Sequence, residues 1–248
     1  MIKIRDLKKQ FPNQEVLKGV SLDIPKGQIT AVIGRSGTGK SVLLKHIIGL
    51  LKPDHGTVFV NGDDITQAEG HRLNELRKKF GMLFQNAALL DSMSVFDNIA
   101  FPLREKTKQT ESEIRERVEE GLANVGIVGM NHKFPAELSG GMKKRVGLAR
   151  ALVTQPEIIL FDEPTTGLDP IMKKAIHKLI YDTQRRFGFT AVMVSHDIPE
   201  VFDFVDQVAM LFDGVIHETG TPGAMQQSTN AAVQQFLRGD LDGPIQIN

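Results

Sequence analysis

A glycine-rich segment at residues 34–41 constrains this chain more than any other feature. It matches the pattern G-x-x-x-x-G-K-[ST] and lies between an apolar run at 28–33 and a helical pattern that contains residues 42–48. In a strand–turn–helix unit of this kind, backbone N–H groups turn inward around phosphates, and the helix N-terminus adds a partial positive charge. The lysine brings a charge to the β- and γ-phosphates, and the last hydroxyl can bind Mg²⁺. The predicted phosphate site consists of Gly34, Arg35, Ser36, Gly37, Thr38, Gly39, Lys40 and Ser41.

The amino-acid composition excludes several classes of protein. The 248 residues include no cysteine, which excludes disulfides, thiolate metal sites and a cysteine nucleophile. The 30 Lys and Arg residues balance the 30 Asp and Glu residues, so no broad basic face and no nucleic-acid partner are expected. No apolar run reaches 18 residues, so no membrane span is expected. Residues 1–6 alternate apolar and polar side chains, which indicates a strand and not a signal peptide.

The order of the patterns indicates an α/β fold with two additions to its core. Period-two alternation over about 1–30 and 56–66 predicts an antiparallel N-terminal β lobe. A mostly helical region at 94–152, with a capping-box spacing at Thr110 and Glu113, predicts an inserted helical lobe.

The second half of the chain alternates strands and helices. Strands are predicted at 157–161, 190–195 and 207–212, with helical stretches at about 170–187 and 197–205 between them. This alternation predicts a mostly parallel sheet that is covered by helices.

A second group of candidate residues ends the apolar strand at 157–161. Asp162 can hold Mg²⁺ through water, and Glu163 can orient the attacking water or accept its proton. Two acids after a strand can also be a simple helix cap, but the upstream phosphate loop favours the catalytic interpretation.

A third group opens the helix that follows Leu138. Ser139, Gly140 and Gly141 at a helix N-terminus make a second anion-binding site, although a plain helix cap is the commoner explanation for such residues. One nucleotide does not need two such sites from one chain. A symmetric dimer resolves this, because the second site can face the partner's nucleotide.

With these motifs in order, the chain resembles the ATP-binding subunits of ATP-binding cassette (ABC) transporters over essentially its whole length. Segment 34–41 resembles their Walker A motif, 158–163 their Walker B motif and 138–142 their signature, with Met142 where many members have glutamine. Val42 also departs from the threonine that many members have there.

The resemblance implies a P-loop ATPase that uses ATP and Mg²⁺ and works as a homodimer on permease subunits. It implies that Gln85 senses Mg²⁺ and the membrane subunit, that His196 touches the γ-phosphate, and that Asp169 belongs to the D-loop. Phe11 lies where the family places an aromatic ring against adenine, and core packing is its alternative. Ser41, Gln85 and Asp162 are then the Mg²⁺ ligands, and Glu163 is the catalytic carboxylate.

The expected domain organisation is one ABC ATPase domain at 1–238 with an extension at 239–248. Within the domain, the β lobe is expected at 1–30 and 56–66, the helical lobe at 86–152, and the core in the remainder.

Two segments, 84–104 and 235–245, resemble the lipid-asymmetry or Mce-associated branch of the family, also labelled toluene tolerance. This resemblance implies a complex of the bacterial inner membrane that moves phospholipids to or from the outer membrane. The ATPase is then expected at the cytoplasmic face, with a permease dimer, an Mce-domain protein and in some systems a STAS-domain protein as partners.

Other branches stay open at this stage. The chain could serve another transporter, for polar amino acids or lipoprotein release, or be a soluble ABC ATPase of the iron–sulfur assembly type. A DNA-repair or chromosome ATPase is poorly supported, because only 104 positions separate Gly34 from Leu138 and leave no room for a long coiled coil. A translation-factor ATPase carries two cassettes, and this chain has one.

The last segment, Phe236 to Asn248, is expected not to form a packed helix, because glycine and proline interrupt any periodicity. Its four apolar side chains predict docking on a second ATPase subunit or a regulatory partner. Disorder is the alternative.

Overall fold

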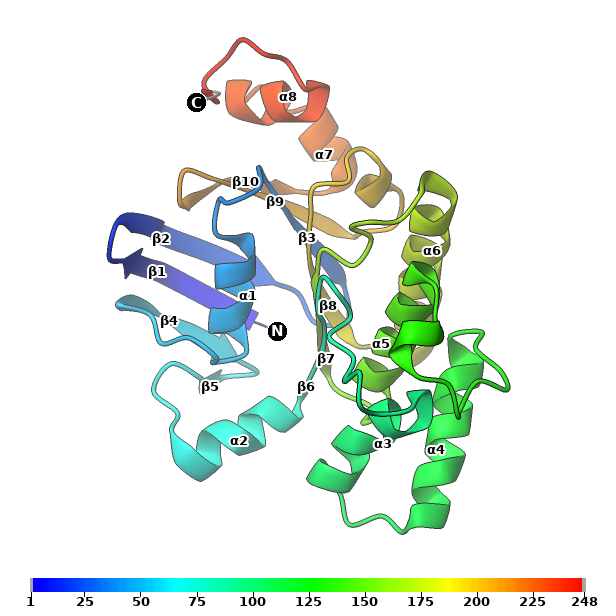
Figure 1. The fold of residues 1–248 in the computed structure, drawn as a ribbon. Helices are drawn as coiled ribbons and strands as arrows, with labels where there is room; N and C mark the ends of the chain where they lie inside the picture. Colours follow the sequence, from blue (N-terminus) through cyan, green and yellow to red (C-terminus); the bar gives the residue numbers. More distant parts are fainter. Residues whose placement is uncertain (1, 247–248) are drawn as a thin grey trace. The chain divides into compact units, whose positions relative to one another are not determined.

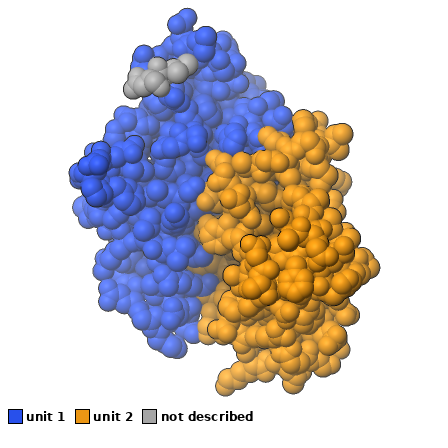
Figure 2. Space-filling view, in the orientation of Figure 1, with its two compact units in different colours: residues 1–77, 190–248 blue, residues 78–189 orange. Residues whose placement is uncertain are grey.

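The computed structural model describes residues 2–246 and divides into two compact units. Unit 1 comprises residues 1–77 and 190–248, and unit 2 comprises residues 78–189; Figure 2 shows the two units in different colours. Among the described residues, no helix is both long and apolar enough to cross a lipid bilayer.

The N-terminal part of unit 1 is an antiparallel sheet with the strand order β2-β1-β4-β5 (Figure 1). Its buried face comes from period-two alternation, because successive side chains of a strand point to opposite faces. Ile2 of β1, for example, is fully buried and pairs with Ile24 on one side and Val60 on the other. The strands are β1 (Ile2–Phe11), β2 (Gln14–Ile24), β4 (His55–Val60) and β5 (Asp63–Asp64).

A second sheet in unit 1 is built around β3, whose five residues are all buried. β3 pairs in parallel with both β8 and β9, and β10 pairs antiparallel with β9. The Asp213-Gly214 turn between β9 and β10 has two positive φ angles, 45° and 77°, as a tight hairpin requires. The strands are β3 (Ile29–Ile33), β8 (Thr190–Ser195), β9 (Gln207–Phe212) and β10 (Val215–Gly220). Helix α1 (Lys40–Ile47) follows β3.

Unit 2 combines two parallel strands with four longer helices. β6 and β7 pair in parallel, and helix α5 packs closely on β6. A Cβ atom at Gly81 would lie 2.4 Å from the carbonyl oxygen of Ala151, so glycine is required for this approach. The elements are β6 (Phe80–Leu83), α3 (Val95–Lys106), α4 (Glu111–Asn124), η1 (Pro135–Glu137), α5 (Gly140–Leu152), β7 (Ile158–Asp162) and α6 (Pro170–Phe187). Parallel strands covered by helices confirm the predicted α/β class.

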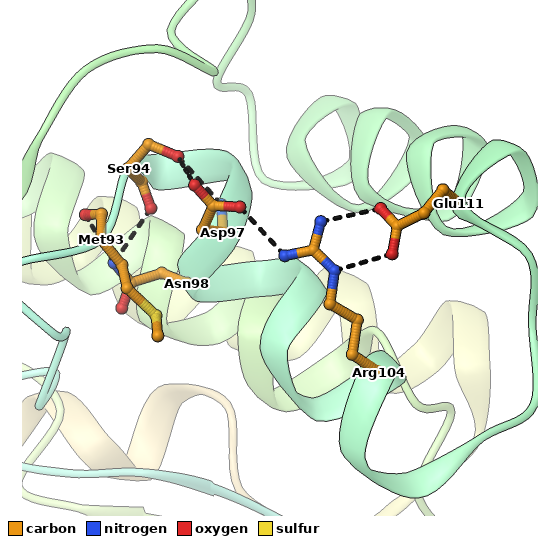
Figure 3. A network of polar contacts seen from close by, with 6 residues as sticks. All are labelled: Met93, Ser94, Asp97, Asn98, Arg104 and Glu111. Carbon is orange, nitrogen blue, oxygen red and sulfur yellow. Dashed lines mark hydrogen bonds and ion pairs between the residues drawn. The ribbon is translucent and has the colours of Figure 1, made fainter.

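A polar network joins α3 to α4 within unit 2 (Figure 3). The guanidinium of Arg104 donates two hydrogen bonds to the carboxylate of Glu111, at 2.9 and 2.8 Å, and a third to Asp97 at 3.0 Å. The Ser94 hydroxyl donates to the Asp97 carboxylate at 2.6 Å and accepts from the backbone N–H of Asp97, so Ser94 caps α3. The hydrogen bond from Ser94 and the Arg104 guanidinium hold the pKa of Asp97 below its usual value.

Two expectations about secondary structure are wrong, and one helix was not expected. The predicted helical stretch at 197–205 contains only the short 3-10 helix η2 (Glu200–Asp203), which follows Pro199, because a residue before proline, here Ile198, is disfavoured in the α region. Helix α2 (Gly70–Lys78) was not predicted, because its sequence is largely polar and has only one buried residue.

The second wrong expectation concerns the C-terminal segment, which was expected not to form a packed helix. Phe236 and Leu237 belong to helix α8 (Ala231–Arg238), which follows the short helix α7 (Pro222–Gln226). After Gly239 the chain folds back toward α8 (Figure 1). Ile245 is buried, at 5% exposure. The Gln235 side chain accepts a hydrogen bond from the Ile245 N–H at 2.7 Å and donates one to its carbonyl at 3.1 Å. The expected tail therefore docks, through 246, on its own chain; Ile247 and Asn248 lie outside the described residues.

Candidate functional site

The phosphate loop lies in unit 1, between the end of β3 and the start of α1. Gly34 and Gly39 have positive φ angles of 154° and 97°. A Cβ atom at Gly34 would lie 2.2 Å from the Leu211 carbonyl oxygen, and one at Gly39 would lie 2.7 Å from the Val16 side chain. The two glycines are therefore required by backbone conformation and by close packing.

Lys40 is built into this loop. It begins α1 and is only 4% exposed. Its ammonium donates hydrogen bonds to the carbonyl oxygens of Gly34 at 2.8 Å and Arg35 at 2.7 Å. The Thr38 hydroxyl donates to the Arg35 carbonyl at 2.9 Å, so the loop is held by its own atoms. Ser41 follows Lys40 as the second residue of the helix.

A cavity of about 470 Å³ opens beside this loop within unit 1. Its volume is in the range of small-molecule binding pockets, and four residues of the phosphate loop, 35–38, line it. The C-terminal segment reaches the same cavity, because Arg35 donates a hydrogen bond to the Gln246 carbonyl at 2.5 Å. The lining residues are Gln14, Glu15, Val16, Arg35, Ser36, Gly37, Thr38, Phe212, Asp213, Gly214, Pro244 and Gln246.

Phe11 ends β1 and is 37% exposed. Its ring lies 5.8 Å from the Lys9 ammonium nitrogen. This exposure argues against core packing, the alternative that the sequence left open for it.

His196 lies near the phosphate loop by strand register. Ser195 of β8 pairs with Ile33 of β3, so His196 and Gly34 both follow the carboxyl ends of adjacent parallel strands. This edge is where α/β sheets commonly bind ligands. His196 is exposed, and the next residue is fixed because the Asp197 N–H donates to the Ser195 hydroxyl at 3.0 Å.

Gln85 and the acidic pair come together in unit 2. Leu83 of β6 pairs with Phe161 of β7, so Gln85 and Glu163 each stand two residues beyond a paired position. The Gln85 amide donates to the Glu163 carboxylate at 3.4 Å. Asp162 ends β7 and is 9% exposed.

Glu163 has an unusual backbone. Its φ angle is +46°, in the left-handed region that non-glycine residues seldom occupy. The Thr166 hydroxyl donates to its carboxylate at 3.0 Å, which helps to fix the side chain. Strained residues of this kind concentrate at functional sites.

The signature residues occupy the start of α5. Ser139 is exposed and caps the helix, because its hydroxyl accepts from the Met142 N–H at 3.3 Å. Gly140 is also exposed, and a Cβ atom at Gly141 would lie 2.3 Å from the Met172 side chain. The plain cap that the sequence suggested as an alternative is therefore present, and a contact with a partner's nucleotide stays a prediction.

Asp169 is likewise a helix cap in the structure. Its carboxylate accepts from the N–H groups of Ile171 at 3.0 Å and Met172 at 3.1 Å, at the start of α6. Its expected part in nucleotide binding stays a prediction.

Two cations of α5 were missed from the sequence. Lys144 is 5% exposed and donates a hydrogen bond to the Gln85 carbonyl; burial lowers the pKa of its ammonium, and the nearby Glu163 carboxylate opposes that shift. Arg150 donates to the carbonyls of Ala87 and Ala88, and burial lowers the pKa of its guanidinium. Their only sequence signal is a spacing of three residues on each side of Gly147.

Comparison with known proteins agrees with this geometry. Residues 17–166 match the family model described as ABC transporter. The chain is 45% identical over 244 residues to the probable ribonucleotide transport ATP-binding protein mkl of Mycobacterium leprae, covering 98% of this chain and 70% of that protein. It is 41% identical over 245 residues to the intermembrane phospholipid transport system ATP-binding protein MlaF of Escherichia coli, covering 99% of this chain and 91% of that protein.

Solved structures show the same fold. A dimeric ATP-binding cassette in a post-hydrolysis state, bound to ADP and Pi, aligns with a TM-score of 0.82 at 31% identity. That alignment covers 90% of this chain and 99% of the other.

Proposed function

Because the chain belongs to the ABC transporter ATP-binding family, we propose that it powers the movement of phospholipids between the membranes of a bacterial envelope. The chain is an ABC-type ATPase that uses ATP and Mg²⁺. The observation that carries the choice of cargo is its 41% identity to the phospholipid-transport protein of Escherichia coli over 99% of its length.

The proposed chemistry divides between the two units. In unit 1, Lys40 and the N–H groups of the phosphate loop hold the phosphates, Phe11 stacks on adenine and His196 contacts the γ-phosphate. In unit 2, Glu163 orients the attacking water and accepts its proton. Mg²⁺, held by Ser41, Gln85 and Asp162, would neutralise charge on the phosphates.

We propose that two copies act together, with each nucleotide between the phosphate loop of one chain and Ser139, Gly140 and Gly141 of the other. The dimeric cassette among the similar structures supports this arrangement. The exposed position of Ser139 also supports it, because a partner's nucleotide could reach the helix N-terminus. Asp169 is proposed to contribute at the same interface.

The membrane partners are also part of the proposal. A permease dimer would receive the ATPase at the cytoplasmic face of the inner membrane, with an Mce-domain protein and a STAS-domain protein as further subunits.

The test is reconstitution of the whole transporter. The ATPase is purified with its membrane subunits, placed in vesicles that contain fluorescent phospholipid, and supplied with ATP. Phospholipid transfer that stops in Glu163→Gln supports the proposal. The mycobacterial relatives carry a ribonucleotide-transport name, so ribonucleotide uptake is measured in parallel. Uptake of ribonucleotide without phospholipid transfer contradicts the proposed cargo.

The shared-site dimer has its own test. A Lys40→Ala chain is mixed with a Ser139→Arg chain in the assembled transporter. In a hybrid dimer, one site then carries both defects and the other site is intact. We expect ATPase activity to return on mixing, whereas two sites that each belong to a single chain would both stay defective.

A further inference from the structure

The loop that carries Gln85, residues 84–94, has a backbone that its own residues do not favour. Ala87 and Ala88 have φ angles of +58° and +46°, in the left-handed region that favours glycine. No glycine occurs in this segment. Contacts from outside the loop must therefore hold this conformation.

Two side chains of helix α5 provide such contacts to the first half of the loop. The Lys144 ammonium donates to the Gln85 carbonyl. The Arg150 guanidinium donates to the Ala87 carbonyl at 2.6 Å and to the Ala88 carbonyl at 2.7 Å. The two cations therefore bind three of the four carbonyl groups at 85–88, including those of both left-handed residues.

Gly147 lets the helix come close enough for these bonds. It lies midway between the two cations, so all three residues lie on the side of α5 that faces the loop. A Cβ atom at Gly147 would lie 2.7 Å from the Leu83 side chain and 3.1 Å from the Ala87 Cβ. The three-residue spacing of Lys144, Gly147 and Arg150 therefore corresponds to one face of α5, which packs on the loop.

The second half of the loop is held from α3. The amide of Asn98, which is 1% exposed, accepts a hydrogen bond from the Leu90 N–H at 2.8 Å and lies within 3.1 Å of the carbonyls of Leu90, Met93 and Ser94. Figure 3 shows Asn98 beside Met93 and Ser94. With the far half fixed to α3, the near half follows the position of α5.

Helix α5 begins at the signature residues, since Ser139 is its cap. The same helix thus presents Ser139 at its N-terminus and two cations to the loop of Gln85 along its side. We infer that Lys144 and Arg150 are positioning residues that fix Gln85 relative to the signature helix, so that a movement of this helix moves the Gln85 loop. This inference rests on the proposed roles of Gln85 and Glu163.

The experiment combines amide hydrogen exchange of the full chain with ATPase kinetics of the assembled transporter. The variants are Lys144→Met, which keeps the apolar stem, and Lys143→Met as the matched control one residue away. In Lys144→Met we expect the Ala87 N–H, bonded to the Phe84 carbonyl at 2.8 Å, to exchange about tenfold faster, with α6 unchanged. We expect kcat to fall about tenfold and KM for ATP to stay within twofold. Lys144→Arg, which keeps the donor, should restore most of the rate.

A double-variant cycle separates positioning from general packing. If Lys144 acts through Gln85, Lys144→Met should lower kcat less than twofold further in a Gln85→Ala background. An equal, additive loss in both backgrounds overturns the inference. Wild-type exchange at Ala87, or kcat within twofold of wild type in Lys144→Met, also overturns it.

Two results keep the test decisive. Wild-type turnover in Gln85→Ala contradicts the proposed role of Gln85 itself. A failed inference instead leaves Gln85→Ala slow, with Lys144→Met either as fast as wild type or additive with Gln85→Ala. Should Lys144→Met not fold, Arg150→Lys becomes the deciding variant. The planar guanidinium of Arg150 binds two carbonyls, and the compact ammonium of lysine cannot reproduce that geometry. Faster exchange at Ala87 with slower turnover then supports the inference, and wild-type values of both overturn it.

Discussion

The phosphate loop of unit 1 and the Gln85 loop of unit 2 both connect a parallel strand to a helix, but they are stabilised in opposite ways. Each follows a parallel strand and leads to a helix, β3 to α1 in one case and β6 to α3 in the other. In the phosphate loop, the Lys40 ammonium binds carbonyls only five and six residues away. In the Gln85 loop, the equivalent donors lie 59 to 63 residues away in the sequence.

The two loops also obtain their left-handed residues differently. The phosphate loop uses glycine at Gly34, Gly37 and Gly39, which adopts positive φ without steric cost. The Gln85 loop uses Ala87 and Ala88, whose conformation depends on distant side chains. The conformation of the phosphate loop is therefore encoded in its own residues, whereas that of the Gln85 loop depends on the elements packed around it.

Glu163→Gln should have the strongest effect of these variants, because it impairs hydrolysis in unit 2 and leaves ATP binding in unit 1 intact. Glu163→Gln should lower steady-state hydrolysis by about 10²–10⁴-fold, because the amide keeps the shape but cannot accept a proton. ATP affinity, measured by calorimetry on the isolated chain, should stay unchanged. Glu157→Gln, just before the same strand, is the control. Turnover of Glu163→Gln within a few-fold of wild type removes Glu163 from this role.

Lys40→Ala tests the phosphate loop itself. The loss of a charged donor to the phosphates should weaken ATP binding about 10- to 100-fold, because a hydrogen bond to a charged group contributes about 1.5–3 kcal/mol. Lys45→Ala, an exposed residue of the same helix, should bind ATP normally. Equal affinities of the two variants would contradict the phosphate-loop assignment.

Asn98→Ala tests whether the second half of the Gln85 loop depends on α3. The change removes the buried Asn98 amide and leaves partly buried backbone groups of Leu90 and Met93 without their partner, so the free energy of unfolding should fall by about 1–3 kcal/mol in urea titration. Asn86→Ala, an exposed amide in the same loop, should change it by less than about 0.5 kcal/mol. A small effect in both variants would show that the loop does not need this anchor.

Ala88→Gly should change the free energy of unfolding only slightly, and the sign of this change reports whether position 88 is strained. Ala88 is exposed and left-handed, so Ala88→Gly removes a steric cost of about 1–2 kcal/mol but adds about 0.4–1 kcal/mol of chain entropy to the unfolded state. The net result should be a stabilisation on the order of 0.5 kcal/mol in the same titration. Ala123→Gly, on the exposed face of α4, should instead destabilise by about 1 kcal/mol. Destabilisation by Ala88→Gly would mean that this position is not strained.

Predictions from the sequence were confirmed where the signal was local. The capping box of Thr110 and Glu113 forms as its spacing predicts, and the Asp213-Gly214 turn joins two antiparallel strands. The strands at 190–195 and 207–212 and the helix at 170–187 have the predicted bounds. One prediction failed at the C-terminus, because Phe236 and Leu237 belong to helix α8, and Ile245 bonds to Gln235 of that helix. Docking of this segment on a partner subunit stays a prediction.

The phosphate loop, with its glycines and its lysine, could be predicted from the sequence alone, because neighbouring residues supply both the conformation and the donors. The α/β class could also be predicted, because strand and helix periodicities are properties of short segments. Three features could not be predicted: the left-handed backbone of Ala87 and Ala88, the contacts of Lys144 and Arg150 with their loop, and the return of the C-terminal segment to Arg35. Those features depend on hydrogen bonds between residues far apart in the chain, and no local pattern encodes which carbonyl a buried cation will meet.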